Sequence, residues 1–292
     1  MNYIILDLEW DSAYCKKKGG FVNQIIQIGA VKLDEHFNQI DRFERVIKSV
    51  LGKRLSKRFT ELTGITGDEM NLGIPFETAV TEYNNWVGQD IVTLTWSNSD
   101  LYAIIENIDL FLENRVSMSI QKYVDLQSYV QNELRLKGFE LTNQISLSNA
   151  AQLLGISTDN YDMHTALDDS LVTAAILKKT YNSQRFSKYI TDATTVDFYK
   201  RLTFRSYYIS KLDDKDIDKK QLVFTCEKCG KRARRLKKWK FKNRWFCNEF
   251  VCDNCKYKFI GRVSFKKTYS GVKVAKRIIY PVESTVKNEI TV

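Results

Sequence analysis

Hydrophobic and polar positions follow two different periods in the first 182 residues of the chain. Short apolar runs predict strands, at residues 3–10, 25–33, 43–47 and 91–96. Apolar residues at spacings of three and four predict helices, at residues 76–87, 101–112, 147–154 and 167–177. The polar segment 34–38 predicts a turn, so the first three strands should form a meander. Strands and helices in this order predict an α/β layer architecture.

The C-terminal part shows a different pattern, with short β-rich runs at residues 222–225, 256–265 and 272–280. Such a small β domain cannot bury a large core and needs another source of stability. Asp and Lys crowd residues 211–220, which is typical of a linker. We therefore expect three segments. These are a large α/β domain at 1–182, a helical and charged linker at 183–220, and a small β domain at 221–292.

Charge divides along the same boundary. The 292 residues carry a formal net charge of +10. The segment from Lys220 to the C-terminus holds 20 basic and 5 acidic residues, a charge of +15, whereas residues 1–219 hold 25 basic and 30 acidic residues, a charge of −5. The apolar fraction of 43% excludes a disordered chain. The basic segment predicts a polyanionic partner.

Several classes of protein are excluded or disfavoured. No apolar run approaches the roughly 18 residues of a membrane span, and the first residues lack the pattern of a signal peptide. No phosphate-cradling glycine motif is present, which argues against an NTPase or a dinucleotide enzyme. Five of the six cysteines fall between Cys226 and Cys255, and this clustering favours metal over disulfides. We expect a soluble, cytoplasmic protein without a membrane partner.

Two carboxylates end the first predicted strand. Residues two apart in a strand share a face, so Asp7 and Glu9 should project together while Leu6 and Leu8 point the other way. Adjacent anions beside a buried strand repel one another, and a bound Mg²⁺ or Mn²⁺ would relieve that repulsion. The alternative is a pair of solvated acids where the strand ends.

Asp100 lies between the strand at 91–96 and the following helix. It is a further candidate carboxylate for a metal site. The spacing Ser97-x-x-Asp100 also fits a capping box, in which Asp100 would serve only the helix end.

His164 and Asp169 form the third candidate element. The chain has two histidines, and His36 lies in the predicted turn, so His164 is the candidate general base. Thr165-x-x-Asp168 has the spacing of a helix cap, which leaves Asp169 as the better metal ligand. A packed or exposed loop histidine is the alternative interpretation of His164.

In this order, Asp7-x-Glu9, Asp100 and His164-x₄-Asp169 resemble the three motifs of the DEDDh group of 3′–5′ exonucleases. The similarity covers about residues 1–182 and extends to four further segments, at residues 23–31, 55–66, 124–127 and 146–156. It is closest to the exoribonuclease branch that includes the histone-mRNA exonuclease and the sporulation-inhibitor-type proteins. Gln24 stands where members of the family often carry an acid, and we do not expect this to remove activity.

The resemblance implies an RNase H-like α/β domain with a mixed five-stranded sheet and two-metal phosphodiester hydrolysis. It assigns Asp7 to both Mg²⁺ or Mn²⁺ ions, Glu9 and Asp169 to the ion near the attacking water, and Asp100 to support through water. His164 would accept the proton of that water.

Cys226-x₂-Cys229 and Cys252-x₂-Cys255 have the spacing that brings four thiolates onto one structural Zn²⁺. We expect a zinc ribbon whose long gap forms a β-hairpin, and a redox dithiol is the alternative. Cys247 would be a hairpin core residue or a substitute ligand, and Cys15 has no assigned role.

Between the cysteine pairs, nine of the fourteen residues at 231–244 are basic, and aromatic residues interleave with them. Cations contact phosphates and aromatic faces stack on unpaired bases. The candidate contacts are Arg232, Arg234, Arg235, Lys237, Lys238, Lys240, Lys242, Arg244, Trp239 and Trp245. Alternation equally allows Trp239 and Phe241 to be core residues of the ribbon.

The sequence therefore predicts a metal-dependent 3′–5′ exonuclease that releases nucleoside monophosphates from single-stranded nucleic acid, with RNA favoured on family resemblance. The alternatives are a DNA-directed proofreading or repair exonuclease and a catalytically inactive nucleic-acid-binding protein. The complete set of acids and histidine argues against the inactive protein.

Overall fold

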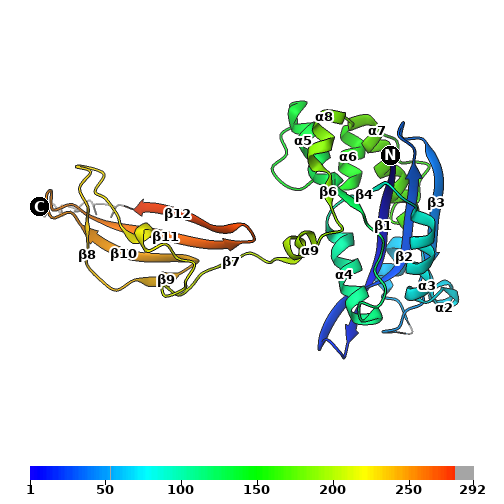
Figure 1. The fold of residues 1–292 in the computed structure, drawn as a ribbon, viewed down its shortest axis with the longest axis horizontal. Coiled ribbons are helices and arrows are strands. Elements are labelled where there is room, and N and C mark those ends of the chain that lie inside the picture. The colour runs from blue at the N-terminus through cyan, green and yellow to red at the C-terminus, as the bar shows by residue number, and fades with distance from the viewer. Residues whose placement is uncertain (53, 280–292) are drawn as a thin grey trace, which may run out of the picture. The chain divides into compact units, whose positions relative to one another are not determined.

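A mixed six-stranded sheet organises the first part of the chain (Figure 1). The computed structural model describes residues 1–52 and 54–279, and the chain divides into two units, Met1–Leu202 and Thr203–Val292. In the first unit the strand order is β3-β2-β1-β4-β5-β6. The strands are β1 (Asn2–Cys15), β2 (Gly20–Leu33), β3 (Gln39–Val46), β4 (Ile91–Thr95), β5 (Lys122–Asp125) and β6 (Thr191–Asp192). β1, β2 and β3 form the predicted antiparallel meander, and β4 runs parallel to β1.

Helices cover both faces of this sheet. One face, with Ile4, Leu6 and Leu8, packs against α3 (Phe76–Val87) and α4 (Ser99–Leu112). The other, with Tyr3 and Ile5, packs against a second group of helices. That group is α5 (Leu126–Leu136), α6 (Leu147–Leu153), α7 (Ala166–Thr180) and α8 (Ser183–Phe186). Asp7 and Glu9 continue the Tyr3 face, as strand alternation predicts.

Short helices complete the first unit, α1 (Lys57–Thr63), α2 (Gly67–Leu72), η1 (Ser187–Tyr189) and α9 (Val196–Thr203). Among residues 1–52 and 54–279, no helix is both long and apolar enough to cross a membrane.

The helix α5 and the strand β6 were not predicted. In α5 the buried positions include the polar residues Gln127, Gln131 and Glu133. The buried face of this helix therefore lacks the apolar periodicity from which helices are predicted. Glu133 is neutralised by Arg185, which donates two hydrogen bonds of 2.6 Å to it. β6 adds a sixth strand to the implied five, because its two residues pair antiparallel with β5.

Residues 183–220, expected as a helical and charged linker, contribute to both units. Phe186 and Phe198 are buried in the cores of the first unit. Ile209 and Ile217 are buried in the core of the second unit.

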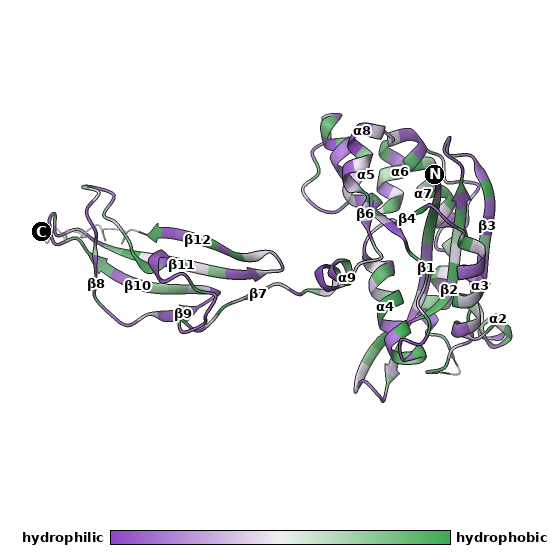
Figure 2. Ribbon diagram, in the orientation of Figure 1, coloured by the Kyte–Doolittle hydropathy of each residue, from purple (hydrophilic) through white to green (hydrophobic). Residues whose placement is uncertain are grey.

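The second unit is a β domain with the order β12-β11-β10-β8, to which β7 and β9 add at the edges. Its elements are β7 (Tyr207–Tyr208), η2 (Lys219–Leu222), β8 (Arg234–Arg235), β9 (Lys240–Lys242), β10 (Trp245–Val251), β11 (Lys258–Thr268) and β12 (Gly271–Ile279). Figure 2 shows apolar and polar positions alternating along β11 and β12. The predicted hairpin between the cysteine pairs is β9–β10, and the predicted strand end at Tyr280 lies outside the described residues.

Candidate active site and cysteine cluster

Three carboxylates converge at the end of β1. Oxygen atoms of Asp7, Glu9 and Asp169 all lie within 4.8 Å of one another. Together with Asp100 they line a cavity of about 550 Å³. β1 supplies the first two residues, the first turn of α7 supplies Asp169, and the start of α4 supplies Asp100. Separate elements therefore bring all four predicted acids to one cavity.

Gly29 on β2 allows α7 to approach this closely. It lies opposite Asp7 in the strand register, and a Cβ atom at this position would lie 2.3 Å from the backbone of Ala166 and Leu167. The Ala166 backbone N–H donates to Oε1 of Gln27 at 3.0 Å, and the Ser170 hydroxyl donates to the Gly29 carbonyl oxygen at 3.3 Å. The start of α7 is thus attached to β2, which fixes Asp169 beside Asp7.

Gly29→Ala is expected to lower the hydrolysis predicted from the sequence by about 100-fold. The added methyl group would push the start of α7, which carries Asp169, away from Asp7, and a displacement of about 1 Å can cost that much. Overpacking should also lower the free energy of unfolding by about 1–3 kcal/mol. Gly20→Ala is the matched control, because nothing lies within 4 Å of a Cβ atom there. Turnover and thermal unfolding of both variants check this, and equal turnover for the two would contradict it.

Asp100 does not cap its helix through Ser97. Asn98 occupies the N-cap position of α4 without a side-chain cap hydrogen bond, and the Ser97 hydroxyl accepts from the Ser99 backbone N–H at 3.1 Å. Asp100 itself is only 4% exposed, and its carboxylate accepts from the backbone N–H of Leu8. The capping-box interpretation of Asp100 is therefore wrong, and its carboxylate belongs to the cavity.

His164 lies at the entrance to α7 in an exposed turn with a left-handed backbone, φ 76°. Its backbone N–H donates to Oδ1 of Asp169 at 3.4 Å, while its imidazole is not among the side chains that line the described cavity. Thr165 caps α7, as predicted, by accepting from the Asp168 backbone N–H. The carboxylate of Asp168 accepts from the Asp162 backbone N–H at 2.8 Å, so Asp169 alone of the two acids reaches the cavity.

The electrostatics of the cavity favour a cation. Burial raises the pKa of Asp7 well above its usual range, and the nearby carboxylates of Asp100, Glu9 and Asp169 raise it further. Burial followed by repulsion from Asp169 raises the pKa of Glu9 to about 8. Burial also raises the pKa of Asp100 to about 7, against the opposing backbone N–H donors. A divalent cation would replace the protons that these crowded acids otherwise retain.

Sequence reasoning gave no role to several cavity residues, including Trp10, Arg58 and Phe59. Ser56 caps α1 by accepting from the Phe59 backbone N–H, and Asp11 accepts from the Ser56 backbone N–H at 2.6 Å and from its hydroxyl at 2.7 Å. Asp11 lies two residues after Glu9 on the same strand. Its position was the one feature of the sequence that could have predicted this attachment of α1 to β1. Arg58 is a basic side chain among the acids, suited to a phosphate.

Gln24, the departure from the family pattern, is buried and has a structural role. Its Oε1 accepts from the Ser49 hydroxyl at 2.9 Å and from the Leu51 backbone N–H at 3.2 Å. It holds the 49–51 loop and does not line the cavity.

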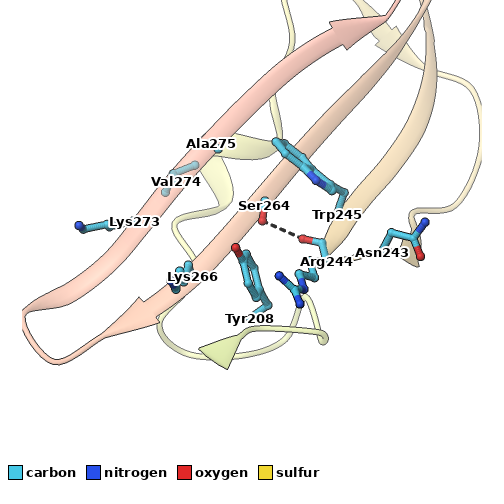
Figure 3. A pocket seen from close by; sticks show the side chains of 9 residues that line it. All are labelled: Tyr208, Asn243, Arg244, Trp245, Ser264, Lys266, Lys273, Val274 and Ala275. Atoms are coloured by element: carbon cyan, nitrogen blue, oxygen red, sulfur yellow. Dashed lines mark hydrogen bonds between the residues drawn. The ribbon is translucent and has the colours of Figure 1, made fainter. Parts of the chain in front are cut away.

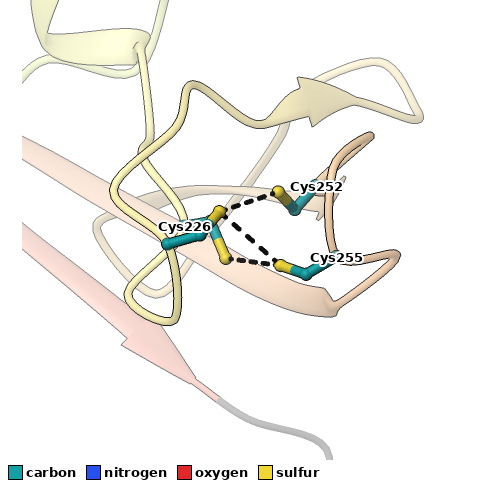
Figure 4. A group of neighbouring side chains, drawn as sticks. Cys226, Cys252 and Cys255 are labelled. Carbon is teal, nitrogen blue, oxygen red and sulfur yellow. Dashed lines mark hydrogen bonds between the residues drawn. The ribbon is translucent and has the colours of Figure 1, made fainter.

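The four paired cysteines form a cluster in the second unit, and Figure 4 labels three of them, Cys226, Cys252 and Cys255. The Sγ atoms of Cys226 and Cys255 lie 3.4 Å apart, those of Cys229 and Cys252 lie 3.4 Å apart, and those of Cys255 and Cys229 lie 3.7 Å apart. Sulfurs bound tetrahedrally to Zn²⁺ at about 2.3 Å would lie roughly 3.8 Å apart, so the four donors fit this ion. Gly230 and Lys256, each directly after a cysteine pair, have the left-handed backbone of the predicted knuckle turns.

The thiols of the cluster compete for protons. Hydrogen bonds, the largest from the Cys255 backbone N–H, lower the pKa of Cys252 to about 6. Hydrogen bonds with neighbouring sulfurs, first that of Cys226, raise the pKa of Cys255 to about 12. Cys247 is not part of the cluster and is half-buried on β10, so it is not a substitute ligand among the described residues.

The basic segment at 231–244 does not form one uniform surface. Trp239 packs against Phe224 and Phe250, and so belongs to the core of the second unit. Phe241 is 41% exposed and packs at its side against Phe246. Trp239 is therefore packed in the core of the second unit, whereas Phe241 remains exposed to solvent.

Known proteins provide an independent comparison. Residues 6–177 match the exonuclease family (RNase_T). The chain is 24% identical over 216 residues to the PolC-type DNA polymerase III of Clostridium perfringens, covering 74% of this chain and 13% of the polymerase. It is 28% identical over 200 residues to ERI1 exoribonuclease 2 of Xenopus laevis, covering 60% of this chain and 28% of that protein. The chain thus spans a minor part of these relatives.

Two solved structures show the same fold. Cell-death related nuclease 4 (CRN-4) aligns with a TM-score of 0.54 at 19% identity, over 73% of this chain and 69% of its own. The nuclease domain of 3′hExo, described as a DEDDh family member bound to rAMP, aligns with a TM-score of 0.51 at 21% identity, over 61% of this chain and 90% of its own. The predicted α/β, RNase H-like fold class is confirmed. Because the family match spans more than half of its residues, this chain belongs to the exonuclease (RNase_T) family.

Proposed function

We propose that this protein is a metal-dependent 3′–5′ exonuclease that hydrolyses single-stranded nucleic acid, preferring RNA, and releases nucleoside monophosphates. The observation that carries the proposal is the convergence of Asp7, Glu9 and Asp169 beside the buried Asp100. Four acids with raised pKa values in one cavity form an oxygen donor set suited to Mg²⁺ or Mn²⁺. The reduced thiol cluster fits action in the cytoplasm.

Each side chain has a distinct task in this proposal. Asp7, Glu9 and Asp169 would hold two divalent ions, with Asp100 supporting them. When bound, such ions stabilise the negative charge that develops on the attacking and leaving oxygens of a phosphodiester. Arg58 would bind a phosphate, and the partly exposed Trp10 would offer apolar surface to a terminal nucleoside.

His164 would accept the proton of the attacking water on a ring nitrogen. Its place in an exposed turn, with its backbone N–H hydrogen-bonded to Asp169, supports this role. Substrate binding would have to move this turn so that the imidazole reaches the cavity.

His164→Ala is expected to lower turnover by about 10²- to 10⁴-fold, because the proton acceptor is lost. Binding of Mn²⁺, measured by calorimetry, should stay within about threefold of the original protein, because the acids remain. His164→Asn is the matched variant, since asparagine tolerates the left-handed backbone and only the imidazole is removed. If His164→Asn keeps full turnover, His164 has no catalytic role.

The relatives of this chain support RNA and DNA as alternative substrates. ERI1 exoribonuclease 2 acts on RNA by its name, which supports RNA for this chain. The match to a PolC-type DNA polymerase III covers more of the chain and favours a DNA-directed exonuclease as the second candidate. The carboxylate geometry serves either substrate equally.

Matched RNA and DNA oligonucleotides with 3′ overhangs distinguish the candidates. We expect Mg²⁺- or Mn²⁺-dependent release of monophosphates from the 3′ end, faster for RNA, and no release without added divalent ions. Faster degradation of DNA would favour the second candidate. Failure to degrade either, by folded protein that still binds them, would favour a catalytically inactive nucleic-acid-binding protein.

A further inference from the structure

The sheet of the second unit has two chemically different faces. Phe246, Phe250, Phe259, Val263 and Phe265 are buried on one of them. Alternation places the neighbouring residues on the opposite face, and the strand register aligns them across β10, β11, β12 and β7. We call this the outer face, and it comprises Tyr208, Trp245, Arg262, Lys266, Lys273 and Arg277.

Like charges lie directly across from each other on this outer face. Lys266 pairs with Lys273 in the register of β11 and β12, and Arg262 pairs with Arg277. Like charges directly opposite one another in a sheet are destabilising. In addition, Nε of Arg262 is buried and has no hydrogen-bond partner among the described residues. The outer face thus holds positive charge that the fold itself leaves uncompensated.

Three other cations among the described residues of this unit form ion pairs, namely Arg234, Lys237 and Lys267. Arg234 pairs with Asp253 at 3.1 Å and Lys237 pairs with Glu249 at 2.6 Å. Glu249 is the acid that the register places on the outer face, and Lys237 neutralises it. Within the described ranges, no ion pair is formed by Arg244, Lys266 or Lys273. Arg244 thus differs from Arg234 and Lys237, whose charges are already neutralised by acids.

The unpaired cations border a cavity of about 660 Å³ (Figure 3). Tyr208 and Trp245 line it, and among residues 1–52 and 54–279 no carboxylate does. The Arg244 guanidinium lies 5.2 Å from the centre of the Tyr208 ring and the Lys266 ammonium lies 5.8 Å from it. The volume lies in the range of cavities that hold small ligands, about 300–1,000 Å³.

The walls of this cavity are held by the fold. Asn243 and Arg244, with φ of 50° and 69°, form the tight turn that joins β9 to β10. The Ser264 hydroxyl donates to the Arg244 carbonyl oxygen at 2.7 Å and fixes that turn against β11. The aromatic rings and the cations are therefore presented together before a ligand binds.

We propose that the outer face binds one segment of single-stranded nucleic acid, with an unpaired base stacked on Tyr208 or Trp245 and phosphates at Arg244, Lys266 and Lys273. Aromatic faces can stack only on bases that are not enclosed in a duplex, which selects single strands. The inference deepens the proposed function and rests on it for the class of ligand. The proposed binding site lies largely outside the basic segment 231–244, since Tyr208, Lys266 and Lys273 belong to β7, β11 and β12.

Binding is measured with a 5′-fluorescent single-stranded 12-mer of RNA by anisotropy, in the Asp7→Asn background so that no hydrolysis interferes. The test variants are Lys266→Gln/Lys273→Gln and Tyr208→Leu. The control is Lys215→Gln/Lys220→Gln, which removes the same charge from exposed positions of the same unit that lie outside its strands. Zinc content and thermal unfolding confirm that each variant is folded.

We expect Lys266→Gln/Lys273→Gln to weaken binding by roughly 10- to 30-fold near 0.1 M salt and to reduce the slope of log K against log salt by about 1.4, or 0.7 for each lost phosphate contact. Tyr208→Leu should weaken binding by about 5- to 100-fold, and a duplex of the same sequence should not show this loss. The control should stay within about threefold.

Equal losses in the test and control charge variants would overturn the site, as would a Tyr208→Leu effect of the same size on duplex. The proposed function is tested separately by turnover in the protein with Asp7 intact. Turnover with no selective loss of binding refutes the outer face alone. Selective loss of binding without any turnover refutes the exonuclease and leaves the outer face standing.

Discussion

Asp7→Asn is expected to reduce hydrolysis by about 10³-fold or more while making the metal-free protein more stable. Asp7 lies among three other carboxylates, and the ions that they would hold supply several kcal/mol of transition-state stabilisation. The amide keeps the shape of the side chain but, unlike the carboxylate, does not have to take up a proton when the metal-free protein folds. Without metal the variant should therefore unfold about 2–8 °C higher.

The pH dependence of stability provides the check. Glu9 has a pKa near 8 in the fold, against an ordinary value of 4.5. The folded state therefore binds more protons than the unfolded state between these values, and metal-free stability falls as pH rises from about 4.5 to 8. Asp7→Asn should flatten this fall, and added Mg²⁺ should reverse it in the original protein only. Full hydrolysis by the folded variant would refute the assigned role of Asp7.

We propose that the cysteine cluster holds one Zn²⁺, so replacing Cys226 and Cys229 together by serine should abolish zinc binding and unfold the second unit. Structural Zn²⁺ contributes about 10–16 kcal/mol to the folding of small zinc modules, far more than the short core of this unit can replace. Zinc content should fall from about one ion per chain to none, and affinity for single-stranded oligonucleotides should fall with it. Hydrolysis of saturating short substrates should remain within about tenfold, because the acids lie in the first unit.

Cys247→Ser is the matched control for that experiment. Its thiol donates to the Trp245 carbonyl oxygen, at 3.8 Å, and lies outside the cluster. Zinc content and oligonucleotide affinity should be unchanged. Protein purified without chelator that contains no zinc, yet has a folded second unit, would refute the zinc ribbon.

The convergence of the four acids on one cavity was predictable because their signals are local. Strand alternation places Asp7 and Glu9 on one face, and the helix cap at Thr165 separates Asp168 from Asp169 within a single turn. Asp100 was ambiguous, because a capping box and a buried carboxylate share the same spacing. Burial decided between them, and burial depends on where β1 passes α4.

The outer face of the second unit was beyond the reach of sequence reasoning. Tyr208 and Lys266 are far apart in the chain and meet only through the register of β7 and β11. The density of lysine and arginine at 231–244 drew the prediction to that segment instead. Composition shows where cations are frequent, whereas only tertiary structure shows which of them lack a neighbouring acid.

The left-handed backbone at His164 has a consequence for laboratory evolution. A non-glycine residue in this conformation costs about 1 kcal/mol or more, so folding alone would favour Gly or Asn at that codon. A library randomised at position 164 and screened for heat resistance should drift toward those two residues. The same library screened for nucleotide release should return histidine. The difference in residue frequencies between the two selected libraries would measure how strongly stability and turnover conflict at position 164.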